Sequence, residues 1–185
     1  KIIILIGPRQ VGKTTLFKSM ISEAGFLDTA QYWNCDESDV RSMLTKESSA
    51  HFRPLIGKSK FIVIDEAQRV KNIGLILKIL YENFQDVQFA VTGSSSLDLS
   101  NTLNEPLTGR KFEYNIFPFS TNELVHNSSM LDEIRQLETR LVYGFYPDVV
   151  NNPGDEKEIL SNIVSSYLYK DVIAKVKVTL QKESR

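Results

Sequence analysis

The feature that most constrains this chain is a glycine-containing turn near its start. Residues 7–14 read Gly-Pro-Arg-Gln-Val-Gly-Lys-Thr and fit the pattern G-x-x-x-x-G-K-[ST]. The apolar run Ile2–Ile6 precedes them, and a helical pattern from Thr15 to Glu23 follows. A strand, this turn and a helix in that order predict a phosphate-binding loop, because a chance glycine turn would need all three to coincide.

Each part of this phosphate loop (residues 7–14) has an expected role. Glycines let the backbone turn its N–H groups toward phosphate oxygens, and the next helix presents its positive end to the same anion. Lys13 is expected to reach the β- and γ-phosphates, and the Thr14 hydroxyl to bind Mg²⁺. The side chain of Arg9 is expected to point outward, toward a carboxylate or a partner. The predicted nucleotide-binding residues are Gly7, Pro8, Arg9, Gln10, Val11, Gly12, Lys13, Thr14 and Thr15.

A second apolar run, residues 61–64, ends in two carboxylates, Asp65 and Glu66. An aspartate at the end of a buried strand can hold Mg²⁺ opposite Thr14. The adjacent glutamate can orient and activate a water for attack on the γ-phosphorus. Hydrolysis is therefore predicted, although Glu66 alone also fits a helix-capping or solvated carboxylate.

Polar residues also follow the next apolar run, at Thr92-Gly93-Ser94. Thr92 or Ser94 is expected to sense the γ-phosphate and the attacking water, although serines after a strand are also common in turns. Arg110 is a candidate for contacting phosphate charge, in its own site or in that of a neighbouring subunit, and fits a plain surface arginine equally well. Asn34 and Asp36 fit strand-end and capping roles slightly better than a place in the cleft.

Strands alternate with helices along the first two thirds of the chain. This alternation predicts an α/β fold of the P-loop NTPase type, with a parallel sheet of about five strands flanked by helices and its ligands at the carboxyl ends of the strands. Asn72 is expected to cap the next helix, and residues 51–60, with Pro54 and Gly57, are expected to form a loop. The expected strands cover residues 2–6, 31–35, 61–64, 87–91 and 111–116.

The last third has helical patterns. Ser120 and Glu123 are placed to form a capping box, and helices are expected over residues 131–142 and 155–175. We therefore predict an ATPase core over residues 1–118 and a helical C-terminal appendage over residues 119–185. The chain lacks an initial Met, so it is expected to be a fragment whose appendage begins a longer C-terminal region.

Composition narrows the classes of partner. A formal net charge of −1 gives no overall attraction to nucleic acid or to anionic membranes. Nucleic acid is thus expected only through regions missing from this chain, since a solvated helix face explains the lysines after residue 169. Cys35 is the one cysteine, and with His51 and His126 it makes no metal-ligand spacing. A reducing cytoplasmic setting without membrane insertion is expected.

Six elements in order resemble a prokaryotic ATPase family of the AAA+ superfamily. They are residues 7–14, Asn34-Cys35-Asp36, Ile64-Asp65-Glu66-Ala67-Gln68, Thr92-Gly93-Ser94-Ser95, Leu107-Thr108-Gly109-Arg110 and Gly144-Phe145-Tyr146-Pro147. Cys35 stands where the family usually has an aliphatic residue, and Phe145 where it usually has a second glycine.

The resemblance implies a P-loop ATPase core with added helices. Lys13, Thr14, Asp65 and Glu66 would take the phosphate, Mg²⁺, Mg²⁺ and catalytic-base positions, with Ser94 or Thr92 as sensor and Arg110 as a finger. Family members usually continue into a C-terminal domain of unsettled function.

Three activities fit these residues. ATP is favoured over GTP because no Asn-Lys-x-Asp motif occurs. The preferred hypothesis is an Mg²⁺-dependent ATPase that acts alone, as a homo-oligomer or with a protein partner. A nucleotide-gated switch with negligible intrinsic turnover is the alternative. A small-molecule kinase would need an acceptor pocket and an arginine-bearing lid, and Glu66 favours water as the acceptor.

Overall fold

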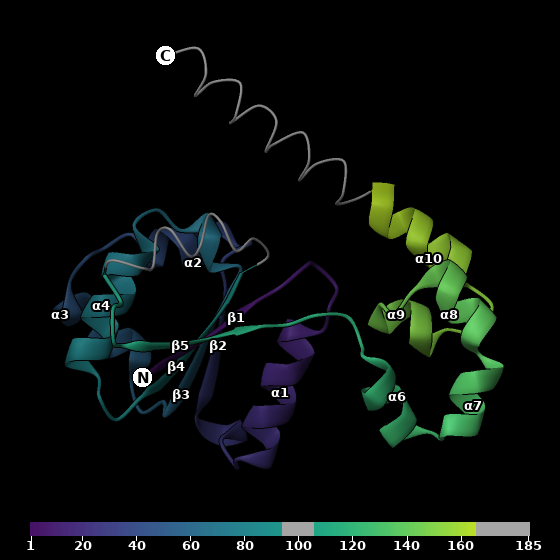
Figure 1. Ribbon diagram of the computed structural model, residues 1–185. Coiled ribbons are helices and arrows are strands. Elements are labelled where there is room, and N and C mark those ends of the chain that lie inside the picture. The colour runs from purple at the N-terminus through teal and green to yellow at the C-terminus, as the bar shows by residue number, and fades with distance from the viewer. Residues whose placement is uncertain (94–105, 166–185) are drawn as a thin grey trace. The chain divides into compact units, whose positions relative to one another are not determined.

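A computed structural model describes residues 1–93 and 106–165 of the 185-residue chain. Its order of elements is shown in Figure 1. The described residues divide into two compact units, the first comprising residues 1–8 and 12–116 and the second comprising residues 9–11 with those from 117 onward. Each unit is described here by itself.

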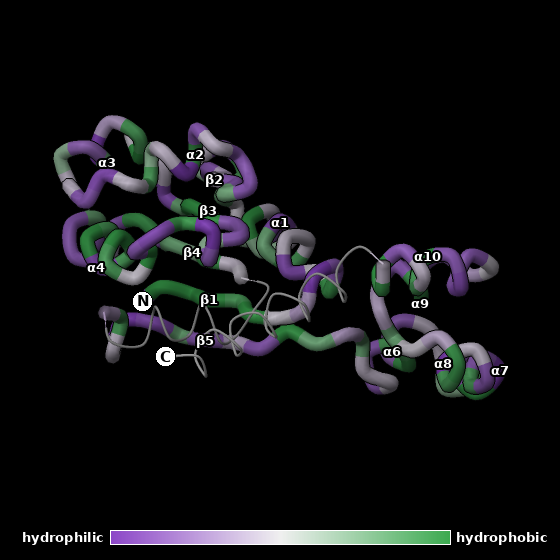
Figure 2. Tube along the Cα trace, turned by 90° about the horizontal axis from the view of Figure 1, so that it is seen from above, coloured by the Kyte–Doolittle hydropathy of each residue, from purple (hydrophilic) through white to green (hydrophobic). Residues whose placement is uncertain are grey.

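The first unit contains a five-stranded sheet in which every neighbouring pair is parallel. The strand order is β2-β3-β4-β1-β5, so that the apolar strand β1 lies inside the sheet (Figure 2). The strands are β1 (Ile2–Ile6), β2 (Ala30–Asn34), β3 (Phe61–Asp65), β4 (Gln88–Gly93) and β5 (Lys111–Asn115). This arrangement confirms the predicted α/β P-loop NTPase fold.

Side chains of each strand alternate between the two faces of the sheet, so both faces are apolar and helices cover both of them. On one face, Phe17 and Ile21 of α1 (Lys13–Glu23) pack with Leu5, Val63 and Ala90. The other face carries the larger core, which includes Ile4, Ile64 and Val91. The helices contributing to that core are α2 (Ser38–Met43), whose Val40 and Met43 pack against it, α3 (Ser49–Ile56) and α4 (Ile73–Asn83). Short 3₁₀ turns lie at Leu27–Thr29 and Ala67–Arg69.

The loop predicted for residues 51–60 is wrong over residues 51–56, which are helical, and only residues 57–60 lie outside a helix. Helix α3 runs through Pro54 and ends at Gly57, which has a φ of 55°. Phe52 and Ile56 lie four residues apart and are both fully buried. Burial of this apolar pair therefore outweighs the backbone hydrogen bond that proline cannot donate.

Gly7 fixes how the phosphate loop leaves the sheet. Its N–H donates to the carbonyl of Gly93 (3.3 Å), and an added Cβ would overlap the carbonyl oxygen of Ile116. We expect Gly7→Ala to lower the free energy of unfolding by about 1–3 kcal/mol, because backbone would have to move. Gly109→Ala is the comparison, since its Cβ meets open space and the cost of about 1 kcal/mol comes from a φ of 73°. Urea unfolding measures both, and a Gly7→Ala protein as stable as wild type would contradict this packing.

The described residues of the second unit lie mainly in helices. Its helices are α6 (Thr121–Asn127), α7 (Met130–Arg135), α8 (Leu137–Tyr143), α9 (Pro147–Asn151) and α10 (Glu156–Ile163). The single helix expected over residues 131–142 is divided at Gln136, and α9 was not predicted. The division into residues 1–118 and 119–185 stays a prediction.

The predicted capping box is present at α6. The Ser120 hydroxyl accepts from the Glu123 N–H (3.2 Å), and the Glu123 carboxylate accepts from the Ser120 N–H (2.7 Å), which holds the pKa of that carboxyl below its ordinary value. Stabilisation by a carboxylate of lowered pKa is complete above the ordinary pKa and is lost as the pH falls through the folded value. We expect Ser120→Ala to reduce amide-exchange protection in α6 about fivefold at pH 7, with a smaller difference in acid. Equal protection in both proteins at pH 7 would contradict this role.

Candidate active site

The phosphate loop leads directly from β1 into α1. Gly12 precedes the helix with a φ of 95°, a conformation that glycine adopts without strain. Lys13 is the first residue of α1 and is only 5% exposed. Its ammonium donates to the carbonyls of Gly7 (2.8 Å) and Pro8 (2.6 Å). The loop thus holds a buried positive charge beside the start of a helix, which suits an anion.

The phosphate loop meets the first carboxylate at Thr14. The Thr14 hydroxyl donates to Oδ2 of Asp65 at 3.2 Å, although the two residues are 51 positions apart. Asp65 is the last residue of β3, and Thr14 lies in the first turn of α1. Magnesium prefers oxygen ligands and usually takes one or two from protein together with substrate phosphates, so this hydroxyl and carboxylate fit it.

Thr92 connects this pair to β4. Its hydroxyl donates to Oδ1 of Asp65 and accepts from the Glu66 N–H (3.0 Å). Thr92 is fully buried, and it lies beside Leu5 of β1 in the sheet. The carboxyl ends of β1, β3 and β4 therefore converge on Asp65, as the parallel arrangement predicts.

Glu66 has an unusual backbone and an engaged carboxylate. Its φ of 53° places it in the left-handed region, where a non-glycine residue is strained. Its Oε2 accepts from the side-chain amide of Gln68 at 2.6 Å. The contact of Glu66 with Gln68 was not predicted from the sequence.

Tyr32 is a site residue that the sequence analysis missed. Its hydroxyl donates to Oδ2 of Asp65, the oxygen that also accepts from Thr14. Burial, followed by this hydrogen bond to Asp65, raises the pKa of Tyr32 above its ordinary value, so the hydroxyl remains a donor at neutral pH. The sequence alone carries no signal for it, because Tyr32 is placed opposite Val63, on the face that carries Asp65, only by the register of the β2–β3 pair.

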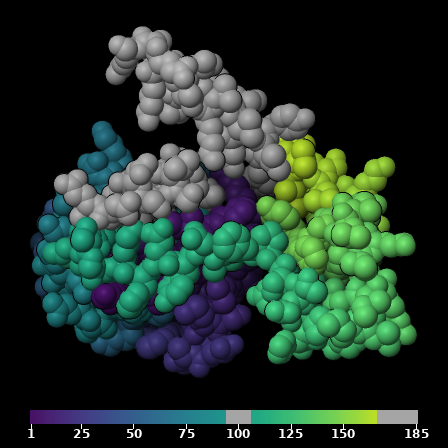
Figure 3. All heavy atoms as spheres, in the orientation of Figure 1, coloured from purple at the N-terminus to yellow at the C-terminus, as the bar shows by residue number. Residues whose placement is uncertain are grey.

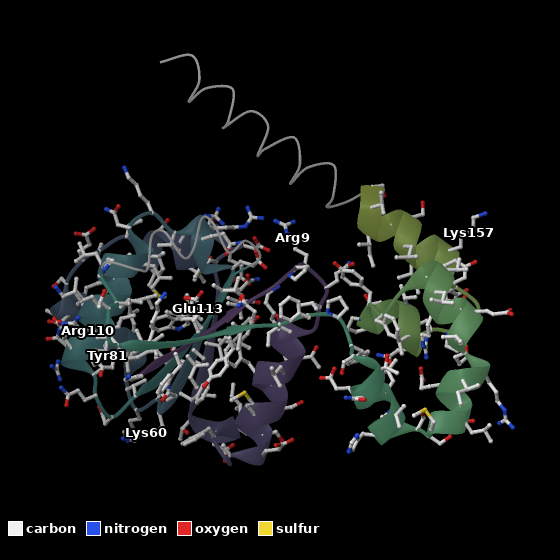
Figure 4. The ribbon with its side chains drawn as sticks, viewed as in Figure 1. Arg9, Lys60, Tyr81, Arg110, Glu113 and Lys157 are labelled. Carbon is white, nitrogen blue, oxygen red and sulfur yellow. The ribbon has the colours of Figure 1, made fainter. Side chains whose placement is uncertain are left out.

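The other candidate residues are placed as follows. Arg110 precedes β5, and its carbonyl accepts from the N–H of Ile2 (2.9 Å). It therefore lies where the strands begin, whereas Asp65 lies at the other end of the strands, where β3 finishes. Its guanidinium pairs with Glu82 of α4 (3.0 Å), near the labelled Tyr81 (Figure 4). Ser94 lies outside the described residues. Thr15 is exposed on α1.

Within the loop, Gln10 has a φ of 61°, and Val11 is buried. The nucleotide-binding roles of all nine residues from Gly7 to Thr15 stay predictions.

The residues at the end of β2 make local contacts, as strand-end and capping residues do. Asn34 Oδ1 accepts from the Asp36 N–H (3.0 Å), and Asp36 forms an ion pair with Arg69. Cys35 is fully buried, and burial raises the pKa of its thiol to about 12. A thiol of that pKa is protonated and unreactive at neutral pH.

Comparison with known proteins identifies the family. Residues 1–125 match a family described as an AAA domain. This chain belongs to that AAA domain family. The AAA domain therefore covers the whole sheet with its phosphate loop and carboxylates, and the chain is a P-loop protein of AAA type.

Three curated relatives of this AAA domain protein are each described as an uncharacterized protein. It is 31% identical to a protein of Mycobacterium tuberculosis over 59% of this chain and 23% of that protein. It is 26% identical to one of Haemophilus influenzae over 91% of this chain and 45% of the relative, and 23% identical to one of Methanocaldococcus jannaschii over 99% and 44%. The chain thus spans less than half the length of these relatives.

A solved DNA replication initiation factor is similar over 78% of this chain and 56% of its own, at 14% identity and a TM-score of 0.45.

Two features are absent from residues 1–93 and 106–165. None of the helices there has the length and apolar character to span a membrane. The same residues contain no group of three or more His, Cys, Asp or Glu side chains arranged to hold a metal ion.

Proposed function

We propose that this AAA domain protein binds ATP with Mg²⁺ and hydrolyses it to ADP and phosphate, coupling hydrolysis to a conformational change. The contact between Thr14 and Asp65 carries the proposal, because it joins the end of the phosphate loop to the end of β3. A hydroxyl and a carboxylate at hydrogen-bond distance beside a buried lysine are the groups that a magnesium–triphosphate complex needs.

Each residue of the site has a separate role in the proposed hydrolysis of ATP. The Lys13 ammonium leaves the carbonyls of Gly7 and Pro8 to donate to β- and γ-phosphate oxygens. Thr14 and Asp65 hold Mg²⁺, which when bound offsets phosphate charge. Glu66 accepts a proton from water as the water oxygen attacks the γ-phosphorus, and the bond to the bridging oxygen of ADP breaks.

Further roles belong to the same proposal. Thr92 or Ser94 senses the γ-phosphate, and the link from Thr92 to both Asp65 and the Glu66 backbone supports Thr92. Arg110 lies at the edge of the sheet opposite to Asp65, so a phosphate contact by Arg110 would be made in a neighbouring subunit of a homo-oligomer. Residues 1–118 form the ATPase core and act in the cytoplasm, and residues 119–185 belong to the appendage.

A second candidate is a nucleotide-gated switch with negligible intrinsic turnover. The hydrogen bond from Gln68 to the Glu66 carboxylate favours it, because an oxygen that already accepts at 2.6 Å is less available to a water molecule. A partner that separated Gln68 from Glu66 would then release hydrolysis.

Calorimetric titration of the protein with ATP tests the nucleotide assignment. We expect ATP to bind more tightly in Mg²⁺ than in excess EDTA, and more tightly than GTP. An absence of ATP binding under both conditions would contradict the proposal, and tighter binding of GTP would reassign the nucleotide.

A further inference from the structure

The Asp65 carboxylate accepts hydrogen bonds from three hydroxyl groups, two of them at the same oxygen. Its Oδ2 accepts from Thr14 and from Tyr32, and its Oδ1 accepts from Thr92. A carboxylate oxygen has about two lone-pair positions. Oδ2 has therefore no acceptor position left for a water or a metal ion while both of its donors remain.

The three donors differ in their freedom to leave. Thr92 is fully buried, and its hydroxyl also accepts the N–H of Glu66. Thr14 lies in the first turn of α1, and its hydroxyl can donate to Asp65 while its own lone pair binds a metal. Tyr32 is 40% exposed on β2, which pairs only with β3 and ends the described sheet. Its side chain can turn toward solvent without opening a cavity in either core, so Tyr32 is the donor that can be displaced.

We propose that Tyr32 is a displaceable latch on Asp65, whose hydroxyl competes with hydrated Mg²⁺ for Oδ2. The inference rests on the proposed function, because Mg²⁺ arrives with the nucleotide. The latch raises the Mg²⁺ concentration that is needed for half of the metal-dependent gain in nucleotide binding. It leaves metal-free binding to Lys13 and the phosphate loop unchanged. Tyr32 is then a residue that sets the metal requirement, acting through Asp65.

Tyr32→Phe tests the latch because it removes one hydroxyl and keeps the ring. The matched control is Tyr114→Phe, because Tyr114 is an exposed residue of β5. Atoms of β5 lie on the face of the molecule that Figure 3 shows. Binding of a fluorescent ATP analogue to the intact chain is titrated with Mg²⁺, and again in EDTA. We expect Tyr32→Phe to lower the half-saturating Mg²⁺ concentration about threefold to tenfold, the range for one hydrogen bond, with no change in EDTA or in Tyr114→Phe.

A second measurement tests the contact without nucleotide. Thermal unfolding of Tyr32→Phe, Asp65→Asn and the double variant in EDTA should give non-additive shifts, because the two changes remove the same hydrogen bond. Additive shifts would overturn the contact. An unchanged or raised Mg²⁺ requirement in Tyr32→Phe would overturn the latch while leaving the proposed function standing. An absence of nucleotide binding in wild type would overturn the proposed function, and the latch with it, even if the shifts are non-additive.

Discussion

Replacing Lys13 by alanine is expected to weaken ATP binding by about 100-fold or more. The lysine ammonium is buried at the phosphate loop, where it donates to two backbone carbonyls. In the proposed complex it donates to phosphate oxygens instead. Hydrogen bonds to charged groups contribute about 1.5–3 kcal/mol each, and two such bonds account for that factor. Calorimetry or displacement of a fluorescent ATP analogue measures the change.

Lys18→Ala is the matched control, because Lys18 lies on the exposed side of the same helix. We expect wild-type affinity from it. Thermal unfolding of both variants separates loss of binding from loss of fold. A Lys13→Ala protein that is folded and binds ATP as wild type does would place the nucleotide somewhere other than the phosphate loop.

Replacing Glu66 by glutamine is expected to lower the hydrolysis rate by about 10²–10⁴-fold while ATP still binds. Glutamine keeps the size of the side chain but cannot accept the proton of the attacking water, and general-base catalysis contributes a factor of this order. Binding persists because the groups placed to hold phosphate and Mg²⁺ belong to Lys13, Thr14 and Asp65. Single-turnover phosphate release and equilibrium binding, measured on the same preparation, test both halves.

Glu23→Gln, an exposed change at the end of α1, controls for the loss of one negative charge and should hydrolyse as wild type does. Unchanged hydrolysis in Glu66→Gln would show that another group takes the proton. If the wild-type protein hydrolyses ATP slowly, the rate of Gln68→Ala tests the switch, because Gln68 donates to Glu66. An increase in its rate would support the switch.

The sheet was predictable because its signals are local and strong. Three of its strands, β1, β3 and β4, are nearly continuous apolar runs, the pattern of strands buried on both faces. Asp65 follows one such run, so its place at the carboxyl edge of the sheet follows from parallel topology alone. Helix α3 was missed because Pro54 and Gly57 are turn residues by propensity, and only the tertiary burial of Phe52 and Ile56 overrides them.

The side-chain partners in the site were less accessible to sequence reasoning. Tyr32 reaches Asp65 only because β2 pairs with β3 in a particular register, and a single sequence does not specify that register. Asn72 precedes α4 as predicted, but its side chain donates to Glu47 instead of capping the helix. Arg110 follows a glycine in a motif-like stretch, yet its distance from Asp65 depends on the direction of β5. In each case the missing information is a long-range contact.

The most direct test of the account is single-turnover release of γ-phosphate from ATP by the wild-type protein, in Mg²⁺ and in excess EDTA. The account predicts release in Mg²⁺ that is abolished by EDTA, by Lys13→Ala and by Glu66→Gln. Protein concentration is varied over a wide range, because a contribution from Arg110 of a neighbouring subunit would make the rate rise with assembly. Tight Mg²⁺-dependent binding of ATP without any release, at every concentration, would contradict hydrolysis by this chain and leave the nucleotide-gated switch as its function.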